Sequence, residues 1–487
     1  MRILLINPPQ DLEALLGVGK AFVQKYEPLG LLYIAAVVRQ AGYQVSVVDA
    51  YAEELSFEQI QERIVEFKPD IVGISTLTCN GEIVYKLGEW MKKNFPEILV
   101  VLGNVHASIY AKYYLDNNYC DVVVHGEGEE IFLKIVKCRE EKKDFSRIPS
   151  ISFLNEQGQE IKTGEQAVVD DLTQLPVPAR DLVKQDLYHL TEISNQLYVG
   201  KKGAIAKTMF TSRGCPNRCT FCVVHGGKKQ RFNSAERVVD ELEMLEKEYR
   251  ASYVFIMDSL FFGDVARLFK ICQGIRERNL KIKWGADAHV RYINKELVEE
   301  IAAANCYELS FGIESGVQRL LNNIKKGTTL EKIEQAIALV KRYSKIKIGG
   351  LFILGLPGET YQDSLQTIRF AKKLPLDIAQ FSLLMPYPGS PLFKELSAKG
   401  EINTGIRPDG TLDASIWTRY SSYISFTEND PIWVTPALSA KELKGLQKRA
   451  QREFYLRPSQ IMKHIKRIRF NNIFKIIKIV RKAFFNI

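Results

Sequence analysis

The stretch TSRGCPNRCTFCVVHG, residues Thr211–Gly226, decides how the rest of the chain is interpreted. It carries Cys215, Cys219 and Cys222 in the pattern C-x3-C-x2-C, so three thiols within eight residues can face one metal centre. A structural zinc ion needs four ligands, and only His225 is near enough in sequence to supply the fourth. An iron–sulfur cube held by three thiolates would instead keep one iron open to another ligand. A zinc loop and three unrelated buried thiols are the alternatives.

Strand and helix signals alternate around this loop. The chain enters it through a strand over Ala206–Gly214. Further strands are expected at Ser252–Asp258, Lys281–Ala286, Tyr307–Gly312, Lys347–Leu354 and Ile378–Met385. Helices are expected at Ala235–Tyr249, Asp264–Arg278, Lys295–Ala304, Leu330–Tyr343 and Tyr361–Leu374. Six strands are fewer than the eight of a closed barrel, so the pattern predicts a partial, TIM-like (βα)6 barrel. Its mouth should gather the residues at or after strand ends, which are Cys215, Asp258, Glu314, Gly355 and Met385.

The N-terminal part shows the same alternation with continuous apolar strands, which is typical of a parallel sheet covered by helices on both faces. We therefore predict a flavodoxin-like or Rossmann-like, doubly wound domain over residues 1–140. Residues 141–200 form a proline-punctuated linker in this interpretation, with irregular chain between about Glu140 and Lys207. The barrel should cover residues 201–395. Residues 396–487 should form a C-terminal region that ends in a helical tail.

The strand ends of the first domain are rich in small and hydroxyl residues. They include Asn7, Ser75-Thr76, Gly103-Asn104 and His125-Gly126-Glu127. Ligands of doubly wound sheets bind at the carboxyl ends of the strands, and small residues there let a large flat ligand approach the backbone. No G-x-G-x-x-G follows the first strand, which argues against a dinucleotide. Ordinary βα turns are the alternative interpretation.

The basic charge of the chain is local. The net charge is +10, but residues 457–487 hold nine Lys or Arg and no acid, and the remainder has 58 bases and 57 acids. This argues against a broad nucleic-acid surface. The apolar residues Ile461, Ile465, Ile468, Ile476, Val480 and Phe484 recur at near-helical spacing. The tail therefore predicts an amphipathic helix at an anionic membrane surface, or else a helix packed on the barrel with a solvated basic face.

The cysteine loop, with Phe221 before its last cysteine, resembles the signature of the radical S-adenosylmethionine (radical SAM) superfamily. Four later stretches match as well: FGIESG (Phe311–Gly316), KKGTT (Lys325–Thr329), GLFILGLPGET (Gly350–Thr360) and LLMPYPGSPLF (Leu383–Phe393). In that family three cysteines bind a [4Fe–4S] cluster, and S-adenosylmethionine takes the fourth iron. One electron then cleaves the sulfonium to a 5′-deoxyadenosyl radical, which abstracts hydrogen from the substrate.

The resemblance implies specific roles in the barrel. Cys215, Cys219 and Cys222 are the implied cluster ligands, and the backbone around Phe221 should lie by the adenine. The remaining implied contacts to S-adenosylmethionine are Asp258, Ser259, Glu314, Ser315 and Gly355. Asp258-Ser259 stands where the family has a Gly-Gly-Glu turn, which is absent here. Glu314 could instead pair with a base such as Arg291, and Gly355–Gly358 could be a tight turn.

A flavodoxin-like domain before such a barrel resembles the cobalamin-binding class of the superfamily, and the two resemblances together cover about residues 1–393. VVLGNVHAS (Val100–Ser108) and VVHGEGEE (Val123–Glu130) look like its fourth and fifth strand ends. The implied cobalamin contacts are Asn7, Ser75, Thr76, Gly103, Asn104, His106, Gly126 and Glu127. The lower-axial motif D-x-H-x-x-G is missing, so we expect cobalt without a protein histidine ligand.

These observations predict an enzyme, a cobalamin-dependent radical SAM methyltransferase that acts on an unactivated carbon through a 5′-deoxyadenosyl radical and methylcobalamin. The alternatives are non-methylating radical chemistry on a tetrapyrrole, isoprenoid or lipid, and a barrel-only enzyme without cobalamin. A non-enzymatic iron–sulfur sensor fits less well. Expected partners are a reductase or flavodoxin-type electron donor and, through the tail, a membrane surface, whereas nucleic acid is not expected. The sequence shows no signal peptide, so a cytoplasmic enzyme, peripheral to the inner face of the membrane, is expected. No catalytic residue beyond the ligands is predicted.

Overall fold

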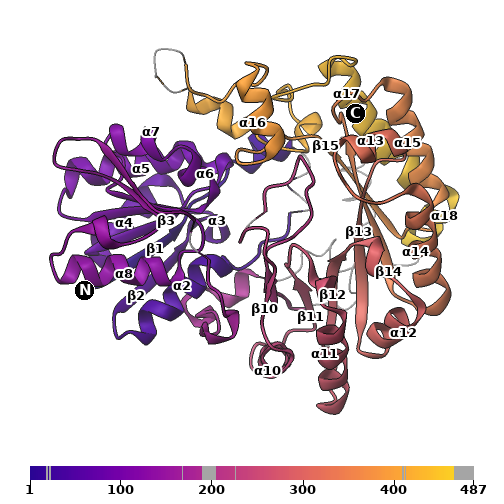
Figure 1. Cartoon of the computed structure of the whole chain (residues 1–487), viewed down its shortest axis with the longest axis horizontal. Helices are drawn as coiled ribbons and strands as arrows, with labels where there is room; N and C mark the ends of the chain where they lie inside the picture. Colours follow the sequence, from indigo (N-terminus) through magenta and orange to yellow (C-terminus); the bar gives the residue numbers. More distant parts are fainter. Residues whose placement is uncertain are drawn as a thin grey trace.

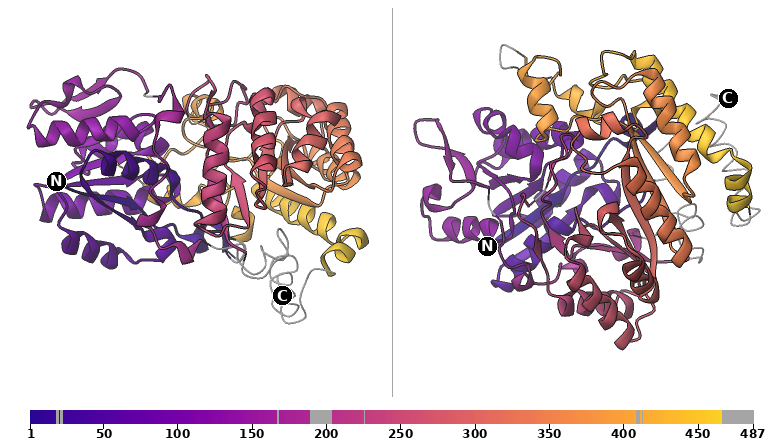
Figure 2. Two further views of the ribbon diagram at one scale, coloured as in Figure 1. Left: turned by 90° about the horizontal axis from the view of Figure 1, so that it is seen from below. Right: turned by 45° about the vertical axis from the view of Figure 1, so that its right-hand side comes forward.

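The computed structural model describes residues 1–17, 20, 23–166, 168–188, 204–224, 226–407, 411 and 413–465. Two α/β units lie side by side, and both views of Figure 2 keep them adjacent (Figures 1 and 2). A C-terminal segment that includes α16 (Pro391–Ala398) runs over the junction between them (Figure 1). Within the described ranges, no helix has the length and apolarity to cross a membrane.

The N-terminal unit is built on one seven-stranded sheet with the order β2-β1-β3-β4-β5-β6-β7. The strands are β1 (Arg2–Asn7), β2 (Gln44–Asp49), β3 (Ile71–Ser75), β4 (Leu99–Gly103), β5 (Val122–Val124), β6 (Ile151–Leu154) and β7 (Glu160–Thr163). The first five pair in parallel, and their order 2-1-3-4-5 is that of a flavodoxin-like fold. The predicted doubly wound sheet is confirmed.

Helices cover both faces of this sheet, because successive side chains of a buried strand point to opposite sides. Leu4 and Ile6 of β1 share a core with α4 and α5, whereas Ile3 and Leu5 share one with α2 and α8. The helices of this unit are α1 (Leu12–Leu16), α2 (Leu29–Gln40), α3 (Ala50–Glu53), α4 (Phe57–Phe67), α5 (Gly81–Asn94), α6 (Asn104–Ile109), α7 (Ala111–Asp116) and α8 (Glu129–Glu140). Between β4 and β5 the chain forms two short helices, α6 and α7, in place of one long helix.

The sheet continues past residue 140, into the segment that the sequence pattern assigns to a linker. β6 pairs antiparallel with β5, and β7 pairs antiparallel with β6. The expectation of irregular chain between about Glu140 and Lys207 is therefore wrong for these two strands. They are only four residues each, and β7 is mostly half-buried, so an apolar run of the kind that marks the parallel strands is missing.

The second unit is the predicted partial barrel of six parallel strands, in the order β15-β14-β13-β12-β11-β8. The strands are β8 (Ala206–Met209), β11 (Tyr253–Ile256), β12 (Lys283–Ala288), β13 (Cys306–Glu314), β14 (Lys347–Leu354) and β15 (Ile378–Leu383). The helices that follow them are α10 (Ala235–Lys247), α11 (Val265–Glu277), α12 (Lys295–Ala303), α13 (Gln318–Asn323), α14 (Leu330–Tyr343) and α15 (Tyr361–Lys373). A short hairpin of β9 (Ser212–Arg213) and β10 (Arg231–Phe232) frames the cysteine loop.

The C-terminal region protects the last strand of the barrel and binds the first unit. α17 (Ala440–Tyr455) packs on β15, where Gln447 Nε2 donates to the carbonyl of Phe381 over 2.7 Å. On the other unit, Trp417 packs against the ring of His106, with 4.2 Å between the ring centroids. The hydroxyl of Tyr110 also donates to the carbonyl of Thr404 over 3.0 Å. This region therefore fixes the two units to each other.

Candidate active site

The cysteine loop is held by backbone bonds from three directions. The amide of Cys215 donates to the carbonyl of Gly227 over 3.1 Å, and the amide of Thr220 donates to Ile324 over 3.1 Å. The carbonyl of Thr220 in turn accepts from the amide of Leu392 over 2.9 Å, at the start of α16. Gly214 before the first cysteine has a φ of 84°, and a Cβ there would lie 2.3 Å from the carbonyl oxygen of Lys229. Only glycine fits this close approach.

The three thiols are free, and they lie close enough for the charges of Cys219 and Cys215 to act on Cys222. Burial first, and then the charges of Cys219 and Cys215, raise the pKa of Cys222 to about 11. Burial also raises the pKa of Cys219, and the ammonium of Lys326 opposes that shift. A nearby cation favours thiolate, which is the form that binds metal. Lys326 belongs to the KKGTT stretch that resembles the radical SAM superfamily, but the resemblance does not predict that its ammonium lies near the cysteines.

Lys326 forms an ion pair with Glu314 at the end of β13. Their Nζ and Oε1 atoms are 2.5 Å apart, and both side chains are buried. Glu314 has a φ of 66° and follows a break in the pairing of β13 with β14. Gly312 makes room for the pair, since a Cβ there would lie 2.6 Å from the Lys326 nitrogen. The expected alternative partner of Glu314, Arg291, is not the residue that pairs with it.

A cavity of about 690 Å³ opens inside the barrel beside this ion pair. Phe221, Glu314 and Met385 line it, so three residues that the sequence predicts at this site face the same space. Tyr26, Asp287 and Glu308 line it as well. The sequence reasoning did not identify these three residues. Asp287 directly follows the strand predicted over Lys281–Ala286, so its position at a strand end could have marked it as a site residue. Tyr26 belongs to the other unit, and no sequence pattern links it to the barrel.

The other predicted barrel residues make contacts within the protein. The buried carboxylate of Asp258 accepts bonds from the amide and hydroxyl of Thr211 and from the hydroxyl of Ser212, at 2.6–2.7 Å. Ser259 is exposed, whereas Ser315 is fully buried and lies 3.1 Å from the Thr367 hydroxyl. Asp258 thus ties the start of the cysteine loop to β11. Whether these residues touch S-adenosylmethionine stays a prediction.

Gly355 directly follows β14 and packs against α17. It has a φ of 84°, and a Cβ would lie 2.9 Å from the side chain of Leu443. Glu359 accepts a bond from the amide of Leu356 over 2.8 Å and closes the turn. The tight turn that was the alternative interpretation is present, and a contact with the adenine stays a prediction.

The strand ends of the first unit form an open, polar edge around β4. Asn104 Nδ2 donates to the hydroxyl of Ser75 over 3.1 Å, and Asn7 Nδ2 donates to Asp49 over 2.7 Å. No atom of the described residues lies within 4 Å of the position that a Cβ on Gly103 would take. Thr76 is fully buried, and its hydroxyl has no hydrogen-bond partner among the described residues.

The other predicted cobalamin residues have partners within the protein. His106 is fully buried, and burial lowers its pKa to about 3. A contact between His106 and cobalamin stays a prediction. Its Nδ1 atom lies 3.3 Å from the hydroxyl of Thr78. The buried ring of His125 is bonded to the hydroxyl of Ser152 over 2.8 Å. Gly126 is exposed, with a φ of 88°.

Glu127 links the edge of the first unit to the frame of the cysteine loop. Its two carboxylate oxygens accept from the Arg231 guanidinium over 2.6 and 2.8 Å. Arg231 also donates to the carbonyl of Gly226 over 2.9 Å, and Arg213 donates to Glu129 over 2.6 Å. The strand-end loop after β5 is therefore bonded directly to both ends of the cysteine loop.

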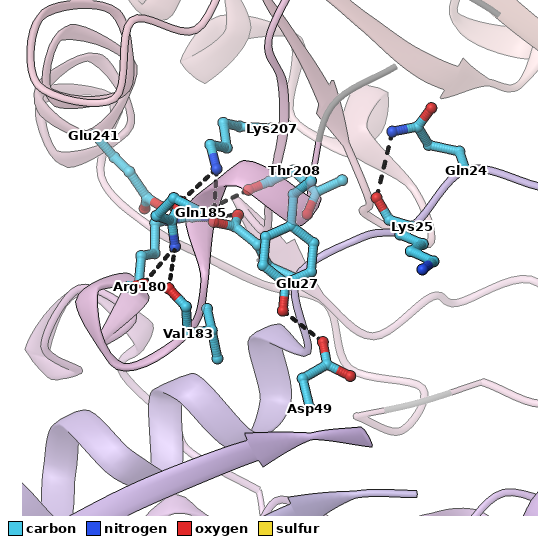
Figure 3. Close-up of polar contacts among 11 residues, drawn as sticks. Gln24, Lys25, Glu27, Asp49, Arg180, Val183, Gln185, Lys207, Thr208 and Glu241 are labelled. Carbon is cyan, nitrogen blue, oxygen red and sulfur yellow. Dashed lines mark hydrogen bonds and ion pairs between the residues drawn. The ribbon is translucent and has the colours of Figure 1, made fainter. Parts of the chain in front are cut away.

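A second, fully buried ion network joins the two units at the start of the barrel (Figure 3). The Arg180 guanidinium forms ion pairs with Glu27 of the first unit and, over 3.0 Å, with Glu241 of α10. Lys207 of β8 donates to Glu27 over 3.0 Å and also to Gln185. No member of the three ion pairs has more than 1% of its side chain exposed. Such charges need every partner, because an unpaired charge in the interior is costly.

The comparisons with known proteins agree with this architecture. The family model of the B12 binding domain matches residues 16–136, and that of the radical SAM superfamily matches residues 209–371. An uncharacterized methyltransferase of Pyrococcus horikoshii is 31% identical over 468 residues, which are 96% of this chain and 95% of that protein. The anaerobic magnesium-protoporphyrin IX monomethyl ester cyclase of Rubrivivax gelatinosus is 28% identical, over 82% of this chain and 71% of that protein.

A solved structure shares the whole fold. The radical S-adenosylmethionine methyltransferase TsrM from Kitasatospora setae, with cobalamin and a [4Fe–4S] cluster bound, superposes with a TM-score of 0.67. It is 18% identical, and the match covers 97% of this chain and 90% of that one. The chain belongs to the family of cobalamin-binding radical SAM enzymes. Its cofactors are a [4Fe–4S] cluster, S-adenosylmethionine and cobalamin, so the barrel-only alternative without cobalamin is wrong.

The residues present fit these groups. Three neighbouring free thiols are the donors that an iron–sulfur cluster requires. Each thiolate binds a different iron of the cluster, so the three sulfur atoms need not converge on a single point. Among the described residues, no group of three or more His, Cys, Asp or Glu side chains is arranged so that it could hold a single metal ion. His225, the expected fourth ligand of a zinc site, lies outside the described residues. For cobalamin, the open space at Gly103 and the unbonded hydroxyl of Thr76 suit a large polar ligand at the sheet edge.

Proposed function

We propose that this enzyme transfers a methyl group to an unactivated carbon of its substrate. The observation that carries the proposal is that Gly389 lies between the two proposed cofactor edges and close to both. A Cβ on Gly389 would lie 3.4 Å from Val105 and 3.1 Å from Ile109 on α6, and 3.6 Å from Val223, which follows the last cysteine. The edge proposed to hold cobalamin thus meets the loop proposed to hold the cluster. The similarity to a methyltransferase along 96% of the chain supports the same conclusion.

Each part of the chain has a defined task in this proposal. When bound, the cluster and S-adenosylmethionine supply the means to abstract hydrogen, and cobalamin supplies the methyl group. Cys215, Cys219 and Cys222 hold the cluster. Lys326 keeps a positive charge near their thiolates, and Glu314 orients that lysine within the barrel mouth. The buried aromatic and aliphatic lining of the barrel excludes water from the reacting atoms.

Non-methylating radical chemistry is the second candidate function. It is favoured by the 28% identity to a magnesium-protoporphyrin IX monomethyl ester cyclase over 82% of this chain. The two functions differ in what they consume. Methylation through cobalamin uses a second S-adenosylmethionine as methyl donor and releases S-adenosylhomocysteine, whereas a cyclisation releases no S-adenosylhomocysteine.

The test follows both products with anaerobically reconstituted enzyme. The protein is given cobalamin, a reductant, S-adenosylmethionine with a ¹³C methyl group and the small-molecule fraction of its host cells. We expect equal increases in 5′-deoxyadenosine and S-adenosylhomocysteine, and one extract compound that gains the label. Cys219→Ala should abolish both increases, whereas the matched control Cys306→Ala, a buried cysteine outside the loop, should retain them. An increase in 5′-deoxyadenosine alone would favour the non-methylating alternative.

The enzyme also needs an electron from outside, for which we propose a reductase or a flavodoxin-type protein in the cytoplasm. We further propose that the basic tail brings the enzyme to the inner membrane surface, where it would meet a lipid-like substrate. Nine bases and no acid in residues 457–487 support this proposal. The apolar positions Ile468, Ile476, Val480 and Phe484 lie outside the described residues.

The membrane proposal is tested by truncation, and the structure sets where to cut. In α18 (Pro458–Ile465), Gln460 is buried and donates to the carbonyl of Leu376 over 2.9 Å, so residues 459–465 should be kept. Removing residues 466–487 should abolish co-sedimentation with anionic vesicles at low salt. If the truncated protein binds as well as the full chain, the tail is not the anchor.

A further inference from the structure

The barrel cavity has two chemically different ends. Glu314 lies at the end of β13 beside the cysteine loop, and Glu308 lies near the start of the same strand, so the two acids are about 20 Å apart along the strand. Both line the cavity. The first end is the one proposed to hold the cluster and S-adenosylmethionine. The far end, around Glu308, has no assigned ligand, and the cavity is long enough to hold a substrate between the two.

Acidic and hydroxyl groups gather at the far end. Asp287 of β12 pairs in register with Ser310, two residues after Glu308 on β13, and its charge raises the pKa of Glu308. Burial, followed by the charges of Glu308 and Asp287, raises the pKa of the Tyr26 phenol to about 12. Ser310 and Gln380 line the same region. Among the described residues that line the cavity, none is Lys, Arg or His. Burial raises the pKa of Glu308, and the charge of Asp287 adds to this shift, so that the pKa is about 7. Lys347, which does not line the cavity, opposes the shift through its positive charge.

One oxygen of this cluster is buried without a partner. Glu308 is 5% exposed, and its Oε2 atom has no hydrogen-bond partner among the described residues. Buried polar atoms are nearly always bonded, and a buried carboxylate oxygen without a donor is costly. Because Glu308 lines the cavity, the missing donor can come from a bound molecule.

Tyr26 is held in place by its neighbours in sequence. Lys25 donates to the carbonyl of Ala52 over 2.8 Å and pairs with Glu54, and Glu27 belongs to the buried ion network of Figure 3. The segment between these anchors therefore presents Tyr26 to the barrel as a fixed wall. A residue of the cobalamin-binding unit thus shapes the substrate cavity of the other unit.

We propose that the far end of the barrel cavity binds a protonated amine of an amphipathic substrate, with Glu308 and Asp287 as its acceptors. The ammonium donates to the free oxygen of Glu308 and compensates the two carboxylates. The apolar part of the substrate lies along Leu351 and Ile353 toward the cysteine loop. This inference rests on the proposed function, because it assigns the class of molecule that would be methylated.

The test measures binding, so that it does not depend on turnover. Reconstituted enzyme is saturated with S-adenosylmethionine, which occupies its own site, and is titrated by calorimetry with 4-phenylbutylamine, 4-phenylbutanol and 4-phenylbutyrate. The three probes share one skeleton and differ in the head group. We expect the amine to bind at least about tenfold more tightly than the alcohol, a difference of about 1.4 kcal/mol, and the acid to bind least.

Variants locate the effect. Glu308→Gln keeps the shape and removes the charge, so it should reduce amine affinity to that of the alcohol. Glu296→Gln, at an exposed position on α12, is the matched control and should change nothing. Asp287→Asn tests the same charge if Glu308→Gln does not fold, as judged by circular dichroism. The proposal is overturned if the amine binds no more tightly than the alcohol, or if neither folded cavity variant weakens it.

The outcome is separable from that of the proposed function. Amine binding that depends on Glu308, together with release of 5′-deoxyadenosine alone in the labelling experiment, would retain the amine site and reject methylation. Methylation of an extract compound without preferential amine binding would retain the methyltransferase function and reject the amine site.

Discussion

Replacing Glu27 by Gln should weaken the whole molecule, because it unbalances the buried ion network between the two units. Arg180 and Lys207 have at most 1% of their side chains exposed. After the change Arg180 still pairs with Glu241, whereas Lys207 loses the carboxylate with which it forms its ion pair in the described part of the chain. Breaking a buried ion pair by removing one partner costs about 3–5 kcal/mol. Typical total stabilities are about 5–15 kcal/mol, so the loss is a large fraction.

The matched control is Asp181→Asn, next to Arg180 in sequence. Asp181 pairs with Arg39 over 2.5 Å, but the side chains are 58% and 45% exposed, and such surface pairs contribute about 0–1 kcal/mol. The assay is thermal unfolding of anaerobically purified protein, followed by tryptophan fluorescence. The entropy of unfolding of a chain of this length is about 1 kcal/mol/K, so we expect Glu27→Gln to lower the midpoint by about 3–5 °C and Asp181→Asn by far less.

A second variant tests whether charge balance is the cause. In Glu27→Gln combined with Lys207→Met, Arg180 and Glu241 are left as a neutral pair, so part of the lost stability should return. If Asp181→Asn lowers the midpoint as much as Glu27→Gln, or if the double variant is less stable than the sum of its single changes, the reasoning is refuted.

Three further outcomes are expected. Because burial holds the pKa of His106 near 3 in the folded protein, the unfolded chain takes up a proton first as the pH falls below about 6.5. The free energy of unfolding should then fall by up to about 1.4 kcal/mol per pH unit toward pH 3. In a series of denaturant titrations at decreasing pH, the midpoint of His106→Phe should fall less steeply than that of the wild type. Gly355→Ala should cost about 1–3 kcal/mol, since alanine at a φ of 84° is strained and its Cβ meets Leu443, and a denaturation curve unchanged from wild type would contradict this. Affinity for 4-phenylbutylamine should rise as the pH increases through about 7, where Glu308 loses its proton, and a flat calorimetric profile between pH 6 and 8 would argue against Glu308 as the acceptor.

The sequence by itself determined most of the architecture, because the relevant signals are local. Continuous apolar runs separated by capped helices predict parallel strands, and α14 and β14 have the predicted bounds. The cysteine loop is local as well, since its three thiols lie within eight residues. The short strands β6 and β7 were missed because they lack such an apolar run.

The placement of the site residues was decided by the tertiary structure. Lys326 meets Glu314 because the chain returns to the mouth of the barrel after α13, and Tyr26 enters the cavity from the other unit. His106 follows a strand end in the sequence, and the ring that packs on it belongs to Trp417, 311 residues later in the chain. The pattern of apolar residues indicates which face of a helix or strand is buried. Which residues pack against that face depends on contacts between segments that are far apart in the sequence. Such pairings form only when the whole chain has folded, which is why only the three-dimensional structure could place these contacts.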